Sequence, residues 1–427
     1  MRNTVVTIFL RLSASAMSFG IGVLAARLAG VSQYGAYAYA MSIVAVATVV
    51  ATLGLDRLVI RAVATQEDTN RREVRGLLSW AQILGVAASI VIVVIAAATW
   101  RFLSAMLDQP TQNALVASVL LLPLSVWIRV QQSALQGSER MIAGQLPESI
   151  VQPAVVALAL IGLATVHKPV DSVQLVSVQT IGAATAGAVG LLMLRRVFPR
   201  AASTASNVMR HREWAVALIP FMLIGVLSIA ANQADMLILG GLKGAEAAGV
   251  YAAAIRCAGL IGFVFASAGV AMAPSFAALH SRGEMELLQR LVTRSARYIL
   301  LFTTPIAVLM IIAGRVILRI FGAEFAQGVT ALRILSVGQW ASAATGLVAF
   351  LLMMTGHARD VTVALAAGMI VNIALSVLLI PQWGIDGAAT AATLTVIFWN
   401  VVLGWFVMKR LGIDATAAGA LGSRHKP

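Results

Sequence analysis

Residues 30–38 read Gly-Val-Ser-Gln-Tyr-Gly-Ala-Tyr-Ala, and residues 244–252 read Gly-Ala-Glu-Ala-Ala-Gly-Val-Tyr-Ala. The two stretches agree at both glycines, the second tyrosine and the last alanine, and they lie 214 residues apart in a chain of 427. A second pair, Leu-Gln-Gly-Ser-Glu-Arg at 135–140 and Met-Thr-Gly-His-Ala-Arg at 354–359, has an offset of 219 residues. These repeats predict two related halves.

The composition places the chain in a membrane. Hydrophobic residues make up 60% of the chain and charged residues 11%, whereas an average soluble domain has about 25% charged residues. A soluble globule of this length needs more charge to cover its surface. Soluble, disordered and nucleic-acid-binding proteins are therefore disfavoured, and the lipid bilayer is the expected surroundings.

Twelve stretches have the length and apolar character of a membrane-spanning helix, which needs about 20 residues. They lie near residues 4–29, 36–60, 77–100, 113–135, 147–166, 173–194, 214–240, 247–275, 295–313, 329–355, 361–380 and 387–408. The alternation typical of a transmembrane barrel is absent. The prediction is an all-α polytopic membrane protein with twelve transmembrane helices in two six-helix lobes. Because six is even, the two lobes form a parallel repeat.

The predicted organisation is a first lobe at 1–200, a cytoplasmic linker at 201–213, a second lobe at 214–410 and a cytoplasmic tail at 411–427. Cytoplasmic loops of membrane proteins collect Lys and Arg. With the N-terminus inside, 20 of the 31 cations fall on the inner side, 5 on the outer side and 6 in spans. Both termini are therefore expected in the cytoplasm, and most of the net charge of +14 reflects topology.

Four segments, spread over both halves, resemble one known family: Ala26–Tyr37, Leu53–Arg61, Gln233–Arg256 and Asn372–Ala389. They are similar to Wzx-type oligosaccharide-lipid flippases, a polysaccharide biosynthesis and export family of the multidrug/oligosaccharidyl-lipid/polysaccharide (MOP) superfamily. The resemblance implies transfer of an undecaprenyl-pyrophosphate-linked glycan, such as an O-antigen or exopolysaccharide unit, to the outer leaflet of a bacterial inner membrane. A monomer, with a polysaccharide polymerase and ligase as partners, is the expectation.

Charges within the spans indicate an anionic cargo. Acids in the spans are Asp56, Glu148 and Asp235, and the cations are Arg11, Arg27, Arg57, Arg129, Arg256 and Arg333. Charges inside a bilayer are costly and face a cavity or a partner, and Arg holds phosphate groups through paired hydrogen bonds. Depth along the span favours Arg11 and Arg256 for the cavity, whereas the arginines near span ends either bind cargo or snorkel to the interface.

Other residues within or beside the spans admit more than one role. Arg57 and Arg61 share a helix face at i and i+4 and form either a cytoplasmic clamp for cargo or a positive-inside anchor. Asp235, with Asn232 one turn earlier, is read as an ion pair with an arginine, a coupling-ion site or a polar cavity wall, the first being favoured. Asn372 is expected in an interhelix hydrogen bond.

Aromatic residues and prolines complete the predictions for the spans. Tyr37 and Tyr251 are expected in the interfacial aromatic belt rather than in a sugar-stacking platform. Pro123, Pro220 and Pro305 lie inside spans and permit kinks.

Competing functions are a lipid II flippase, a multidrug cation antiporter of the same superfamily, a major-facilitator transporter and a membrane enzyme. A cation antiporter needs acids in its cavity, and the major-facilitator glycine pattern is missing after the second span. One cysteine and five histidines without zinc-ligand spacing give no metal motif. No catalytic or cofactor motif is found, so a transporter without metal or cofactor is expected.

Overall fold

The computed structural model describes residues 2–65, 71–105, 107–138, 141–166, 169–197 and 211–419. Within these ranges the regular structure is helical and contains no strand. The all-α fold predicted from the apolar stretches is confirmed.

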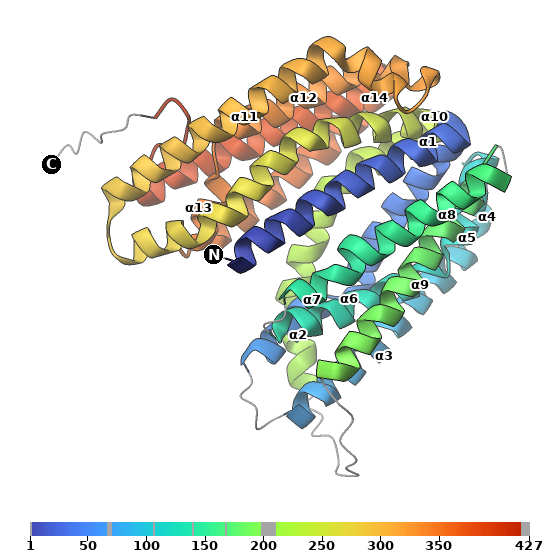
Figure 1. Cartoon of the computed structure of the whole chain (residues 1–427), viewed down its shortest axis with the longest axis horizontal. Helices are drawn as coiled ribbons and strands as arrows, with labels where there is room; N and C mark the ends of the chain where they lie inside the picture. Colours follow the sequence, from blue (N-terminus) through green and yellow to red (C-terminus); the bar gives the residue numbers. More distant parts are fainter. Residues whose placement is uncertain are drawn as a thin grey trace. The chain divides into compact units, whose positions relative to one another are not determined.

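The chain divides into two compact units, one of Met1–Ala230 with Gly244–Glu246 and one of Ala231–Lys243 with Ala247–Pro427. Unit 1 contains the helices of the first half of the chain, which Figure 1 labels. They are α1 (Arg2–Thr52), α2 (Leu55–Thr65), α3 (Arg71–Ala98), α4 (Trp100–Ser104), α5 (Gln109–Ser118), α6 (Leu121–Gly137), α7 (Met141–Leu146), the π-helix η2 (Pro147–Val151), α8 (Gln152–Val166) and α9 (Ser172–Val197).

The helix α10 (His211–Ser281) contributes its first part to unit 1. Unit 2 takes most of the rest of α10 together with α11 (Met285–Arg319), the 3-10 helix η3 (Ala323–Gly328), α12 (Val329–Ala344), α13 (Val348–Met354) and α14 (Ala358–Leu411). The predicted lobe limits at 200 and 214 do not coincide with the change of unit at Ala230, and they remain a prediction about the repeat.

Among the described residues, seven helices are long and apolar enough to cross a membrane, or nine if each of two bent helix pairs is one span. The three longest of the seven, α1, α10 and α14, each contain a glycine with non-helical backbone angles. The polytopic membrane fold is confirmed, and the number of twelve crossings remains a prediction.

Side-chain contacts show that α10 and α14 turn back on themselves. The Tyr251 hydroxyl donates to Asp235, 16 residues earlier in α10, whereas an uninterrupted helix would hold these residues about 24 Å apart. Arg410 Nε lies 2.9 Å from Asp360 Oδ2 although 50 residues separate them in α14. Each element is therefore a hairpin of two helices.

The first glycine of the repeat has the same unusual backbone conformation at both of its positions. Gly30 has φ 75° and ψ 175°, and Gly244 has φ 81° and ψ −176°. This region of backbone space is essentially restricted to glycine. The match between the two glycines supports a structural repeat at the offset of 214 residues. The second repeat has no such match, because Gly356 has φ 84° whereas Gly137 closes helix α6.

The prolines differ in their effect. Helices α5 and α6 meet at 45°, and Pro123 is the third residue of α6. Its missing N–H leaves the carbonyl of Val119 without its helical donor, so the bend at this point agrees with the predicted kink. By contrast, α11 continues as one helix through Pro305, so this proline does not end its helix, and a kink there remains a prediction. Pro220 lies outside the described side chains.

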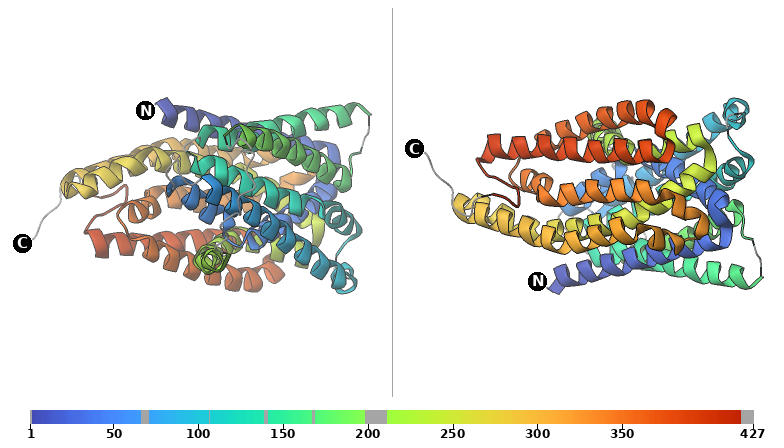
Figure 2. Two further views of the ribbon diagram at one scale, coloured as in Figure 1. Left: turned by 90° about the horizontal axis from the view of Figure 1, so that it is seen from below. Right: turned by 90° about the horizontal axis from the view of Figure 1, so that it is seen from above.

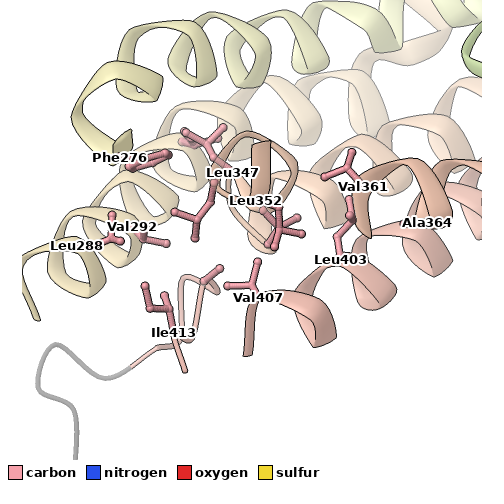
Figure 3. Close-up of a cluster of buried hydrophobic side chains, with 14 of the residues drawn as sticks. Phe276, Leu288, Val292, Leu347, Leu352, Val361, Ala364, Leu403, Val407 and Ile413 are labelled. Carbon is pink, nitrogen blue, oxygen red and sulfur yellow. The ribbon is translucent and has the colours of Figure 1, made fainter. Parts of the chain in front are cut away.

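In unit 2, helices α11, α12 and α14 lie side by side (Figure 2). A buried cluster closes one end of this unit, and its labelled members in Figure 3 come from five segments of the chain: Phe276 of α10, Leu288 and Val292 of α11, Leu347 and Leu352 around the start of α13, Val361, Ala364, Leu403 and Val407 of α14, and Ile413 after α14. The residues that follow α14 are thus part of the core of unit 2.

Candidate functional site

A polar pocket of about 200 Å³ lies within unit 1, between α1, α6, η2, α8 and α9. Its polar lining is Thr48, Ser125, Arg129, Gln132, Glu148, Gln152 and Gln179. These side chains come from segments that are far apart in the sequence, so the pocket is a product of the tertiary fold. One of the predicted cargo-binding arginines, Arg129, faces it.

Two helical spacings place most of this lining. Ser125, Arg129 and Gln132 are four and three residues apart on α6, which puts them on one face. Glu148 and Gln152 are four residues apart across the junction of η2 and α8. A π-helix is rare and is frequently found at a functional site, and here it carries Glu148 into the pocket lining.

Two polar atoms of the pocket lining are buried without a hydrogen-bond partner among the described residues. Thr48 is 4% exposed and Gln132 is 8% exposed. Thr48 Oγ1 and Gln132 Nε2 have no hydrogen-bond partner among the described residues. Buried polar atoms without partners are uncommon in native proteins and call for an explanation.

The charges of the pocket are balanced without a direct contact. Arg129 is half-buried and Glu148 is exposed, and both line the pocket. Ion pairs elsewhere include Arg290 with Glu286 and Arg410 with Asp360, whereas none among the described residues joins Arg129 to Glu148. Arg129 and Glu148 therefore face the same space with no ion pair between them.

The other predicted arginines lie in both units. Arg27 is exposed near the end of the first helical part of α1, and Arg57 and Arg61 are exposed on α2. Arg256 is half-buried in the part of α10 that belongs to unit 2. The backbone of Arg11 lies in α1, but its side chain is outside the described residues.

The surroundings of Asp235 differ from the favoured prediction. Asp235 is buried, and the side-chain donor recorded for its carboxyl group is the hydroxyl of Tyr251, not an arginine. Asn232, one turn earlier, is exposed. Tyr251 is fully buried and Tyr37 is 9% exposed, so the prediction that these tyrosines belong to an interfacial belt is wrong.

Asn372 does not make the expected bond through its oxygen. It is 2% exposed, and its Oδ1 has no hydrogen-bond partner among the described residues. Ser376, one turn later, is buried with an equally unpartnered hydroxyl. The interhelix bond is instead made by Asn400, whose Nδ2 is 3.2 Å from Ser342 Oγ and whose Oδ1 accepts from Thr345.

The sequence analysis identified Arg129 and noted Glu148, but it missed the five other polar residues of the lining: Thr48, Ser125, Gln132, Gln152 and Gln179. A sequence pattern could have indicated Gln132: it is a polar residue in an apolar span, three residues after Arg129 and therefore on the same helix face. In the described part of the chain, no group of three or more His, Cys, Asp or Glu side chains could hold a metal ion.

Comparison with known proteins gives two family matches. The model of a family described as polysaccharide biosynthesis protein matches residues 1–280, and the MatE family model matches residues 220–378. An uncharacterized membrane protein of Methanocaldococcus jannaschii is 25% identical over 228 residues, which span 52% of this chain and 45% of that protein. The chain thus matches about half the length of this curated relative.

Solved structures share the fold over nearly the whole chain. An inward-facing multidrug resistance MATE family transporter of the MOP superfamily has a TM-score of 0.77 at 13% identity, covering 95% of this chain and 98% of that chain. The inward closed lipid II flippase MurJ has a TM-score of 0.74 at 13% identity, covering 94% and 87%. At this identity the similarity establishes the fold alone.

Proposed function

Since this chain belongs to the polysaccharide biosynthesis protein family of the MOP superfamily, we propose that it is a flippase for an undecaprenyl-pyrophosphate-linked oligosaccharide. The family match over residues 1–280 is the observation that carries the proposal. The protein is a transporter of the membrane. Its proposed cargo is a polysaccharide repeat unit that moves from the cytoplasmic to the outer leaflet of a bacterial inner membrane.

The charge inventory supports an anionic headgroup. Six arginines against three acids fall within the predicted spans, and one of the acids, Asp235, is engaged by Tyr251. A pyrophosphate is well matched by Arg, whose planar guanidinium makes paired, charge-assisted hydrogen bonds. We assign cargo contacts to Arg11, Arg256, Arg27, Arg57, Arg61 and Arg129, with alternating access of two six-helix lobes.

The alternatives use the same fold with a different cargo. The MatE match over residues 220–378 supports a multidrug cation antiporter as the second candidate. The excess of cations over acids in the predicted spans disfavours a cationic cargo. The cargo of a lipid II flippase has the same lipid pyrophosphate and differs in the sugars and peptide attached to it. Cytoplasmic termini and a partnership with a polymerase and a ligase belong to the proposal.

Reconstitution tests the proposal directly. The purified protein is placed in liposomes that contain, in separate arms, a lipid-linked oligosaccharide from a producing strain, lipid II or a fluorescent cationic drug. Protection of the headgroup from an impermeant glycan-cleaving enzyme measures flipping. Flipping of the oligosaccharide carrier is the expected result, whereas transport of lipid II alone or of the drug alone would assign the protein to an alternative.

A cellular experiment with matched variants tests the arginines. Depletion is expected to accumulate the lipid-linked glycan in the cytoplasmic leaflet, and complementation measures each variant. Arg11→Ala and Arg256→Ala should each reduce export by about tenfold or more, since a bond to a charged group contributes roughly 1.5–3 kcal/mol. Arg315→Ala, at an exposed position of α11, is the control and should export normally. Normal export by both Arg11→Ala and Arg256→Ala would overturn the cavity assignment.

A further inference from the structure

The polar pocket of unit 1 is poor in net charge and rich in uncharged hydrogen-bonding groups. Its lining contains three glutamines and two hydroxyl residues, together with one arginine and one glutamate. An amide both donates and accepts, and so does a hydroxyl. The pocket thus offers donors and acceptors in many directions while its formal charges cancel.

Two of these groups lack partners at depth. Thr48 Oγ1 and Gln132 Nε2 are unpartnered among the described residues, and both residues are more than nine-tenths buried and line the pocket. An unsatisfied buried polar group costs about 1–3 kcal/mol. A ligand that accepts from the amide and bonds the hydroxyl would remove this penalty.

The remaining lining is apolar. It consists of Met41, Val44, Ala45, Leu121, Ile128 and Ala183. A ligand that fits must therefore present carbon-bound hydrogens to these side chains and hydroxyl groups to the polar ones. The volume of about 200 Å³ is below the roughly 300–1,000 Å³ typical of drug-sized ligands, so it suits a single ring.

From these features, and resting on the proposed function, we infer that the pocket between α1, α6, η2, α8 and α9 binds one uncharged sugar ring of the lipid-linked glycan. Thr48 and Gln132 form hydrogen bonds with its hydroxyl groups. The half-buried Arg129 and the exposed Glu148 form further hydrogen bonds with the same ring. The pocket would thereby read the identity of a sugar, while arginines elsewhere hold the pyrophosphate.

Two other ligand classes fit less well. A pyrophosphate would bring negative charges toward Glu148, with Arg129 as the one cation of the lining. A bound cation would gain one carboxylate but would be repelled by Arg129, and a divalent ion prefers six or more oxygen ligands. A neutral polyhydroxylated ring avoids both conflicts.

Site-specific crosslinking tests the inference in membranes of a producing strain. A photoreactive diazirine amino acid replaces Ser125 or Gln179 in the pocket. The control variant has the same amino acid in place of Ile83, which is 71% exposed. Mild acid then cleaves the bond between sugar and pyrophosphate, and mass spectrometry of the crosslinked peptide identifies the attached group. A sugar adduct is expected at Ser125 and Gln179 and not at Ile83. An adduct of lipid alone at the pocket positions, or no adduct, would overturn the inference.

Two substitutions of similar shape provide the second measurement. Thr48→Val and Gln132→Met remove hydrogen-bonding groups from the pocket, and each is expected to slow flipping about two- to tenfold, as for loss of a single hydrogen bond. Thr52→Val is the matched control, because the Thr52 hydroxyl bonds the Val49 carbonyl of its own helix at 2.9 Å. Unchanged flipping in Thr48→Val and Gln132→Met would also overturn the inference.

The two levels of the proposal fail differently. If the wild-type protein flips no lipid-linked glycan in liposomes, the proposed function fails and the sugar site fails with it. If the wild type flips the glycan but the pocket positions capture no sugar, the function stands and the sugar site is refuted. Thermal unfolding midpoints of all variants verify that each protein is folded.

Discussion

The bond between Tyr251 and Asp235 should be a measurable part of the stability of unit 2. The two residues lie on opposite sides of the Gly244 reversal in α10, so their bond joins the two helices of the hairpin. Tyr251→Phe removes one hydroxyl and leaves a buried carboxyl group without that donor.

The expected magnitude follows from burial and chemistry. Hydrogen bonds between membrane helices average about 0.6 kcal/mol, with a maximum of about 1.7, and bonds to charged groups reach roughly 1.5–3 kcal/mol. Tyr251 is 0% exposed and Asp235 is 7% exposed, so water cannot readily replace the lost donor. We expect Tyr251→Phe to lower the free energy of unfolding by about 2 kcal/mol, about 30-fold in the folding equilibrium.

A double-mutant cycle is the assay. Tyr251→Phe, Asp235→Asn and the double variant are unfolded at equilibrium in mixed micelles titrated with sodium dodecyl sulfate. The double variant should be more stable than the sum of the single effects predicts, by about 1 kcal/mol, because the groups contact each other. Tyr298→Phe is the control, since Tyr298 is 48% exposed and its loss should matter little. A change below about 0.5 kcal/mol in Tyr251→Phe, or additivity of the two substitutions, would refute the reasoning.

Three further predictions concern the backbone and the cysteine. Gly244→Ala should destabilise the protein by about 1–3 kcal/mol through its φ of 81°, whereas Gly404→Ala, with no atom near its added Cβ, should be neutral or stabilising in unfolding titrations. Gly346→Ala places a Cβ 2.4 Å from the Ala415 carbonyl oxygen, so amide hydrogen exchange at 413–417 should become faster. Gly356→Ala is the control, because Gly356 also has a positive φ but has open space around the added Cβ. It should leave the exchange at 413–417 unchanged. Cys257 is fully buried and should resist water-soluble maleimide until the protein unfolds, and rapid labelling of the native protein would contradict its placement.

Apolar length is a local property, and it was sufficient to predict the helical membrane fold. A span of about 20 apolar residues satisfies its backbone within itself, so its existence can be predicted without knowing its neighbours. Gly30 and Gly244 share a position in the sequence repeat, and the structure gives them a shared backbone conformation. The number of crossings was harder to judge, because α1, α10 and α14 stay helical up to their glycines and leave little loop between spans.

Partners of buried polar groups were decided by tertiary structure alone. Charge counting favoured an arginine for Asp235, yet the reversal at Gly244 brings Tyr251 to it. Likewise, Arg129 was identified by its charge, but the glutamines and hydroxyls beside it belong to helices whose packing no local pattern records. The sequence by itself determined that the fold is a helical membrane fold, because the apolar length of a span depends on composition along one segment. Only the tertiary structure decided which polar side chains share a pocket, because that depends on how separate helices pack.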